Sequence, residues 1–151
     1  MRDVGIETAR PADAPIVLDL LLEQFEEHGI AAGGAPLAEA VAAVLADERL
    51  GFFEIARDRN GVVGIAYVSF TWALEHCGKS AWLEELYVVP AARGRGIGRA
   101  LLETALARAA ACGAAAADLE VDRAHARAEN LYRRTGFHPL PRARWVRRLG
   151  S

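Results

Sequence analysis

The chain has little of several features that mark specialised classes of protein. It has only two cysteines, Cys77 and Cys112, and their spacing matches neither a metal site nor a disulfide framework. No apolar run approaches the ~18–20 residues that cross a membrane, and no apolar signal segment follows the charged start at Arg2 and Asp3. Lysine and arginine (18) nearly balance aspartate and glutamate (20), so the net charge of −2 gives no basic field for nucleic acid. We therefore expect a cytoplasmic protein with no nucleic-acid or membrane partner and no metal.

What the chain does contain is typical of one globular domain. Its 151 residues are 52% hydrophobic and 25% charged, which is enough apolar material for a sizeable core. We therefore expect a single domain over residues 1–151. Hydrophobic periodicity and glycine stops predict strands and helices along its whole length. The expected strands cover 4–8, 52–56, 62–72, 82–89, 116–121 and one or two stretches of 137–149, and the expected helices cover 14–28, 37–50, 96–111 and 124–134.

The connections between these elements predict the topology. Short polar turns join the strands at 52–56, 62–72 and 82–89, which should therefore run antiparallel. The helix at 96–111 joins two strands as a right-handed crossover, so those two strands should run parallel. The predicted fold is α/β (α+β), a mixed and mostly antiparallel sheet of six to seven strands with about four flanking helices. Such a sheet binds ligands at the carboxyl ends of its parallel strands.

The segment at 83–102 carries the most information about function. An apolar run ends at Pro90, three glycines then alternate with larger residues, and a helical pattern follows. The unpaired N–H groups at a helix start bind phosphate together with the helix dipole, and glycines let the backbone approach closely. A dinucleotide-binding loop is an alternative, with Glu120 as the ribose ligand. However, the spacing is Gly-x-Gly-x-Gly rather than Gly-x-Gly-x-x-Gly, and the loop lies in the middle of the chain.

Two motifs in order resemble those of the GNAT N-acetyltransferase superfamily. The loop RGRGIG at 93–98 is similar to that family's pyrophosphate loop, Arg/Gln-x-x-Gly-x-Gly/Ala, and the Leu-x-x-Leu-x-Val pattern at 83–88 before it resembles the fourth strand. The segment AENLYRRTGF at 128–137 resembles the family's Ala-x-x-Leu-Tyr-x-x-x-Gly-Phe. The resemblance, closest over 72–137, implies a GNAT-like fold in which the fourth and fifth strands splay apart around the arm of acetyl-CoA, the cosubstrate.

The resemblance also implies which residues bind the cosubstrate. The edge of the fourth strand would pair with the pantetheine arm, and the glycine loop would hold the pyrophosphate. His125 stands where many family members have asparagine, and we interpret it as a variation that can also donate a hydrogen bond. The implied cosubstrate-binding residues are Leu86, Tyr87, Val88, Arg93, Gly94, Arg95, Gly96, Ile97, Gly98, Arg99 and His125.

Three residues are candidates for the chemistry that the resemblance implies. Tyr132 matches the position from which many GNAT enzymes protonate the leaving thiolate, although a helical tyrosine also packs. Glu84 and Glu85 are neighbours on a strand and should point to opposite faces, one into the cleft and one into solvent or a salt bridge. The order LEELYV at 83–88 resembles diamine acetyltransferases, which implies that Glu84 is the base, through water, and Glu85 a ligand of the substrate cation.

The acceptor wall is expected at the end of the first helix. Phe25, Glu26 and Glu27 lie there, and the acids would favour a cationic amine, although a solvated helix end is the plainer interpretation. The leading hypothesis is acetyl transfer to a small polyamine-like or lysine-like amine, by direct attack in a ternary complex. A peptide, protein or antibiotic acceptor and a non-catalytic acyl-CoA-binding domain remain alternatives. Family resemblance further implies a homodimer.

Overall fold

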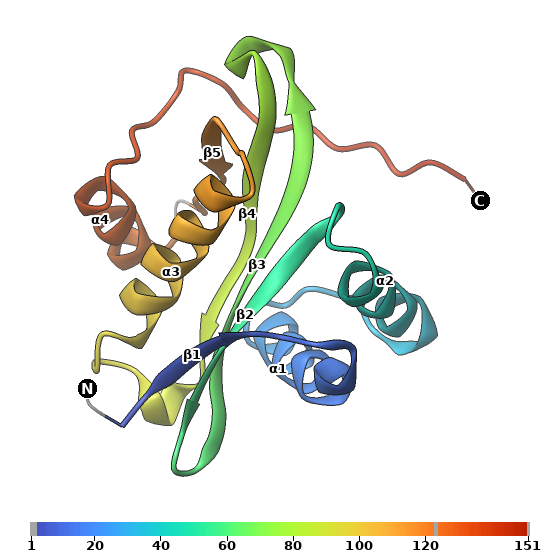
Figure 1. Ribbon diagram of the computed structural model, residues 1–151, viewed down its shortest axis with the longest axis vertical. Helices are drawn as coiled ribbons and strands as arrows, with labels where there is room; N and C mark the ends of the chain where they lie inside the picture. The colour runs from blue at the N-terminus through green and yellow to red at the C-terminus, as the bar shows by residue number, and fades with distance from the viewer. Residues whose placement is uncertain (1–2, 123, 151) are drawn as a thin grey trace. The chain divides into compact units, whose positions relative to one another are not determined.

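The structure, a computed structural model, describes residues 3–122 and 124–150. It consists of two compact units, one ending at Glu120 and one beginning at Val121. Figure 1 shows the order of the elements along the chain. None of the helices in these described ranges combines the length and apolar character needed to span a membrane.

The first unit is built on a five-stranded sheet whose strands follow in chain order. Its strands are β1 (Gly5–Thr8), β2 (Gly51–Asp58), β3 (Gly61–Ala73), β4 (Gly78–Val88) and β5 (Ala116–Leu119). The first four are antiparallel to their neighbours, and β5 runs parallel to β4. Short 3-10 turns lie at Pro11–Asp13, Leu74–His76 and Pro90–Ala92. The predicted antiparallel and parallel pairings are confirmed.

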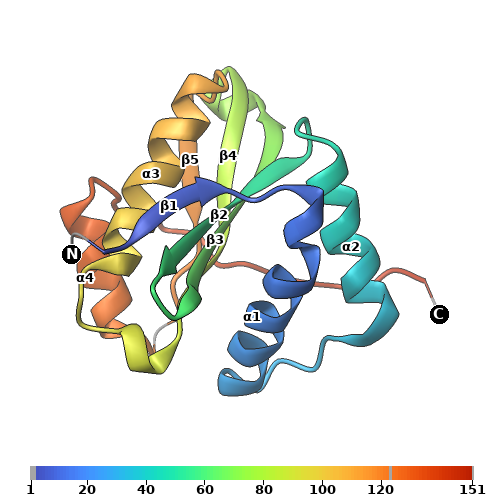
Figure 2. The same cartoon turned by 60° about the horizontal axis from the view of Figure 1, so that its bottom comes forward.

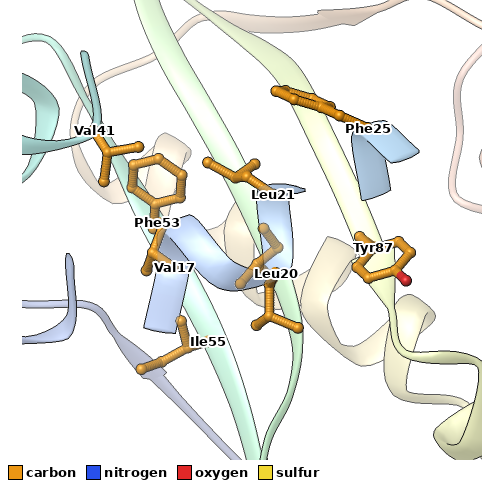
Figure 3. Packing of buried hydrophobic residues seen from close by; sticks show 9 residues of the cluster. Val17, Leu20, Leu21, Phe25, Val41, Phe53, Ile55 and Tyr87 are labelled. Atoms are coloured by element: carbon orange, nitrogen blue, oxygen red, sulfur yellow. The ribbon is translucent and has the colours of Figure 1, made fainter. Parts of the chain in front are cut away.

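Helices cover both faces of this sheet. One face carries α1 (Ala14–Glu27) and α2 (Gly34–Ala46), and the other carries α3 (Ile97–Ala111), as Figure 2 shows. Apolar residues recur along α1 at helical spacing, and Figure 3 shows Val17 and Leu21 packed toward Phe53 of β2. The core on this face therefore fixes how α1 lies along the sheet.

The second unit contains α4 (Ala126–Arg134) and a C-terminal segment without strands. The sequence predicted one or two strands within 137–149, and therefore six to seven strands in all. The described residues form five, so that prediction is wrong. Pro139 and Pro141 cannot donate to a strand ladder, and the side chains of Trp145, Val146 and Leu149 are 88–91% exposed. The alternation of arginines with apolar residues in this segment does not produce a buried face.

Candidate functional site

The loop before α3 presents backbone N–H groups at a helix start. Gly94 and Gly96 have φ angles of 77° and 78°, in the left-handed region that favours glycine. The first helical backbone bond runs from the N–H of Ala100 to the carbonyl of Gly96, at 3.1 Å. The N–H groups of residues 97–99 therefore have no partner inside the helix. With the helix dipole, they form a site suited to an anion.

The three arginines around this loop are balanced by carboxylates. The ion pairs are Arg93 with Glu27 at 2.7 Å, Arg95 with Asp58 at 2.9 Å, and Arg99 with Glu103 at 2.8 Å. Arg93 also donates through Nε to the carbonyl of Val88, at 2.9 Å. The Arg95 guanidinium holds the pKa of Asp58 below its usual value. Arg93 and Arg95 thus tie the loop to α1 and to the β2–β3 hairpin, beside the backbone amides at the start of α3.

The outer edge of β4 is open beyond the end of β5. The last β4–β5 pair is Leu83 with Leu119, whereas β4 continues to Val88. The N–H of Val89 donates to Val63 of β3 at 2.9 Å, so alternation turns the backbone groups of Leu86 toward the opposite, open edge. Within the described ranges, no strand pairs with that edge beyond Leu83. An extended ligand with amide groups could pair there.

Tyr87, which follows Leu86 on β4, has its side chain in the core. Its side chain is 5% exposed and belongs to the core cluster under α1, as Figure 3 shows. Burial raises the pKa of its hydroxyl, and the carboxylates of Glu27 and Glu23 raise it further. The Arg93 guanidinium lies 5.6 Å from the centre of its ring. Tyr87 therefore connects the core to the loop, and alternation directs its backbone toward β3.

A β-bulge places Glu84 and Glu85 on the same side of the sheet. Tyr67 of β3 pairs with Glu85 and the next residue, Val68, pairs with Leu83, which leaves Glu84 as an extra residue. The Glu84 carboxylate accepts a hydrogen bond from Ser69 at 2.9 Å. Because Ser69 and Tyr67 are two residues apart on β3, they share a face. The expectation that these two acids point to opposite faces is wrong, because the bulge interrupts the alternation.

Glu85 is the more deeply placed of the two acids. Burial raises its pKa to about 7, a hydrogen bond from the Gln24 side chain opposes that rise, and the Glu84 carboxylate adds to it. Burial raises the pKa of Tyr67, and the carboxylates of Glu84 and Glu85 raise it further. Within the described ranges, no lysine, arginine or histidine forms an ion pair with either glutamate. The two acids therefore form an anionic cluster that has no cationic partner among the described residues.

The end of α1 influences this cluster through a residue that the sequence analysis did not select. Phe25 is buried in the core, Glu26 is exposed, and Glu27 pairs with Arg93. Gln24 is instead the α1 residue whose side chain lowers the pKa of Glu85. It is 5% exposed, and its Oε1 has no hydrogen-bond partner among the described residues. The available signal was a polar residue inside the apolar stripe of α1, one turn after Leu20 and Leu21.

The second unit holds the two remaining predicted residues. Tyr132 lies on α4, and its ring meets that of Phe137 edge-on, with centroids 5.9 Å apart. The N–H of Phe137 donates to the Tyr132 carbonyl at 3.0 Å, just after the positive φ of Gly136. His125 precedes the helix, and its carbonyl accepts from Glu129 at 3.2 Å. The motif at 128–137 is thus a helix that ends before Gly136 and whose end is packed by the rings of Tyr132 and Phe137.

Comparison with known proteins gives a family match. The sequence model of the Acetyltransferase (GNAT) family matches residues 15–137. No curated protein matches the chain in sequence. The chain is similar to a crystal structure of an integron cassette protein from the mobile metagenome of Cole Harbour Salt Marsh. Their identity is 25% and the TM-score is 0.85, over 97% of this chain and 91% of that one.

Two further solved structures share the fold at lower identity. One is a predicted acetyltransferase from Clostridium acetobutylicum with acetyl-CoA, at 18% identity and a TM-score of 0.80 over 95% of this chain and 96% of that one. The other is an aminoglycoside acetyltransferase from an uncultured soil metagenomic sample in complex with sisomicin. It is 17% identical, with a TM-score of 0.83 over 99% of this chain and 98% of that one.

Proposed function

This chain belongs to the GNAT acetyltransferase family, and from that premise we propose that it transfers an acetyl group from acetyl-CoA to the primary amine of a small cationic acceptor. The observation that carries the proposal is the combination of two features on strand β4. Its edge is open beyond Leu83, and its bulge carries two acids, Glu84 and Glu85, that have no cationic partner among the described residues. Both units would serve a single acetyltransferase domain.

The residues of the first unit fit the cosubstrate. The free N–H groups of residues 97–99 suit the pyrophosphate, and Gly98 leaves room there, because an added Cβ would meet only Val88, at 3.8 Å. The outward groups of Leu86 suit the amides of the pantetheine arm, which would bind as an extra strand does. We propose that Arg93, Arg95 and Arg99 flank the phosphates, while their carboxylate partners hold the loop in place.

The acceptor side of the proposal rests on charge. Glu84 is exposed and Glu85 is half-buried, and a carboxylate withdrawn from water without a partner is unfavourable. A cationic acceptor would supply the missing charge, and a neutral one would leave the acids unpaired. Lysine-like amines and diamines satisfy this requirement. Aminoglycosides do so as well, and the similar enzyme solved with sisomicin makes them the second class to test.

We propose that Tyr132 protonates the departing thiolate, because its motif matches the family pattern. Tyr132→Phe keeps the ring and its packing against Phe137 while removing the proton donor. Loss of a general acid lowers the rate by about 10²–10⁴-fold. We expect kcat to fall by that order while acetyl-CoA affinity, measured by calorimetry, stays constant. A variant with the kcat of the unaltered protein would limit Tyr132 to packing.

A pair of variants at Gly98 tests the cosubstrate site. Gly98 has no positive φ, so a side chain adds no backbone strain, and an acid in the first turn of a helix favours the fold. Gly98→Glu places a carboxylate where phosphate should bind, and like charges brought together are strongly unfavourable. We expect acetyl-CoA affinity to fall at least about tenfold, or 1.4 kcal/mol, with the melting temperature unchanged.

The neutral variant Gly98→Gln is the control for bulk. It should weaken acetyl-CoA binding less than Gly98→Glu does, because it lacks the repulsive charge. If Gly98→Glu, Gly98→Gln and the unaltered protein bind acetyl-CoA with equal affinity, the cosubstrate does not bind at this loop. A thiol-release assay with diamines, lysine analogues, aminoglycosides and N-terminal peptides then identifies the acceptor class. Binding of acetyl-CoA without thiol release from any amine would favour a non-catalytic acyl-CoA-binding domain.

We propose that the protein forms a homodimer. The supporting observation is the exposed apolar side chains of Trp145, Val146 and Leu149 in a segment without strands. Light scattering at micromolar concentration tests this, and a monomer mass there would refute it.

A further inference from the structure

The two units of this chain carry opposite net charges. Up to Glu120 the sequence has eighteen aspartates and glutamates against ten lysines and arginines, and from Val121 onward it has eight arginines against two acids. The nearly neutral total therefore combines an acidic first unit with a basic second unit. When two copies of the chain meet, the acidic surface of one attracts the basic surface of the other.

The exposed side of α1 carries only negative charge. The helix has no lysine, arginine or histidine, and its exposed acids Asp19, Glu23 and Glu26 follow one another at intervals of four and three residues, so they form one stripe. None of the ion pairs among the described residues includes these three acids. Like charges at this spacing destabilise a helix, and a basic partner would offset that repulsion.

An apolar groove lies beside this acidic stripe, between α1 and α2, the two helices that Figure 2 shows next to each other. Pro15 on the α1 side of the groove precedes Asp19 by one helical turn, so the stripe borders the groove. The exposed Glu39 is the one charged residue in the sequence of α2. The residues that line the groove are Ala14, Pro15, Leu18, Ala38 and Val41.

The C-terminal tail, residues 142–149, has the complementary character. Its sequence RARWVRRL contains four arginines and no acid. The side chains of Trp145, Val146 and Leu149 are 88–91% exposed, so the described residues of their own chain leave them uncovered. Arg147 and Arg148 take part in none of the ion pairs among the described residues. Exposed apolar side chains bordered by polar ones are typical of an interaction surface.

The acidic stripe and the C-terminal tail also agree in length. An extended chain of the tail's length spans at most about 26–29 Å, and α1, which has 14 residues, is about 21 Å long. The tail can therefore lie along the whole helix, with Trp145 near the middle. Tryptophan and arginine are the residues that most often contribute strongly to protein interfaces, and a guanidinium group can form two parallel hydrogen bonds to one carboxylate.

We propose that the C-terminal tail of one copy docks on the α1–α2 surface of a second copy, with Trp145 in the apolar groove and Arg147 and Arg148 on the acidic stripe. This inference rests on the proposed homodimer and assigns the surface that receives the tail. A second copy is the occupant because a chain leaves the apolar side chains of its own tail exposed. In a two-fold dimer the contact forms twice, since each copy supplies one tail and one groove.

The first experiment removes the aromatic ring that fills the groove. Trp145→Ala should raise the dimer dissociation constant, measured by analytical ultracentrifugation of the full chain, at least about tenfold. Trp72→Ala is the matched control, because Trp72 is also exposed, at 78%, but lies at the end of β3. We expect its dissociation constant to equal that of the unaltered protein. Equal effects of the two substitutions would overturn the proposal.

The second experiment reverses charges. Glu23→Arg should raise the dissociation constant at least about tenfold, and adding Arg147→Glu and Arg148→Glu to the same chain should restore part of the lost affinity. Glu48→Arg is the control, because it changes the net charge equally at an exposed residue outside both helices, and it should have no effect. Salt at about 1 M should weaken the dimer of the unaltered protein. All of these residues are exposed, so we expect the variants to keep its melting temperature.

Hydrogen exchange of the full chain, above and below the dissociation constant, identifies the occupant of the groove. The tail amides should be protected only in the dimer. If the protein is a monomer at all concentrations, the homodimer proposal fails and this inference fails with it. If the dimer forms but Glu23→Arg and Trp145→Ala leave it unchanged, the copies meet on another surface and only this inference fails. Protection of the tail in a monomer would place it on its own copy and would also overturn the inference.

Discussion

Two glutamates on opposite faces of the same sheet have opposite surroundings. Glu54 on β2 is fully buried under α3, where it forms an ion pair with Arg108 and accepts a hydrogen bond from the Thr8 hydroxyl, whose oxygen lies 3.3 Å from each carboxylate oxygen. Glu85 on β4 is half-buried on the α1 face, where the described residues give it no cationic partner and the neutral Gln24 side chain only partly offsets the rise of its pKa. The first carboxylate is neutralised by the protein itself, and the second is not.

This difference separates a structural carboxylate from one available for chemistry. Removing a charge from water is unfavourable unless a partner compensates for it. At Glu54 the compensation ties β1, β2 and α3 together. At Glu85 the missing compensation appears as a raised pKa, which keeps the group ready to gain and lose a proton near neutral pH.

The largest expected effect comes from removing the cation on the α3 face. Arg108→Met leaves Glu54 buried with only Thr8 as partner, and breaking a buried pair in this way destabilises a protein by about 3 kcal/mol. We expect urea unfolding to show a loss of that order. Arg99→Met is the control on the same helix. Its exposed pair with Glu103 is worth under about 0.5 kcal/mol. If both variants unfold alike, Glu54 does not need its cation.

A smaller effect should appear as a pH dependence of stability from the α1 face. The pKa of Glu85 is raised from 4.5 to about 7 in the folded protein. Between these values the folded state holds a proton that the unfolded chain has released, so stability falls as pH rises. Relative to Glu85→Gln, the unaltered protein should lose about 2 kcal/mol between pH 5 and 8, allowing for partial solvent access.

Urea unfolding at several pH values measures this difference directly. The two proteins differ at one residue, so the comparison with Glu85→Gln isolates the contribution of that carboxyl. A parallel pH dependence of the two proteins would mean that Glu85 is already ionised in the folded state. The two glutamates would then differ in burial and in the ion pair of Glu54 with Arg108, but not in their protonation.

The smallest expected effect compares single hydrogen bonds on the two faces. Thr8→Val removes a hydroxyl that serves a buried carboxylate, and we expect a loss of about 1 kcal/mol. Ser69→Ala removes a hydroxyl bonded at 2.9 Å to the exposed Glu84, which water can replace. We expect almost no change there. Thermal unfolding of Thr8→Val and Ser69→Ala measures both losses of stability. Equal losses would contradict the contrast between the two faces of the sheet.

The parts of the molecule that follow from local rules could be predicted from the sequence. The glycine loop before α3, the apolar stripe of α1 and the parallel crossover to β5 each depend on short-range spacing or on chain connectivity. The left-handed φ at Gly94 and Gly96 follows from glycine itself. The family match over 15–137 confirms the interpretation drawn from the loop and the motif at 128–137.

The parts that depend on tertiary partners could not be predicted. The bulge at Glu84 is a mismatch between two strands, and neither strand alone shows it. The influence of the Gln24 side chain on the pKa of Glu85 depends on how α1 lies against β4. Arg93 and Arg95 of the loop form ion pairs with Glu27 and Asp58. These carboxylates lie on distant elements that no local sequence pattern connects to the loop. Residues 142–148 alternate as a strand does, but nearby prolines and the lack of a strand partner in the described structure leave this segment outside the sheet.

The bulge at Glu84 also has a consequence for how this protein can change over generations. Tyr67 and Val68 of β3 are consecutive, and they pair with Glu85 and Leu83. Deletion of the single codon for Glu84 would therefore join two residues that already stand in regular register. We expect such a protein to keep its sheet and melt cooperatively while losing only the outer carboxylate. A chain that no longer folds would show that the bulge is structural. If the chain without Glu84 folds, acceptor preference can change in evolution by the loss or gain of this one residue, with a folded protein before and after the change.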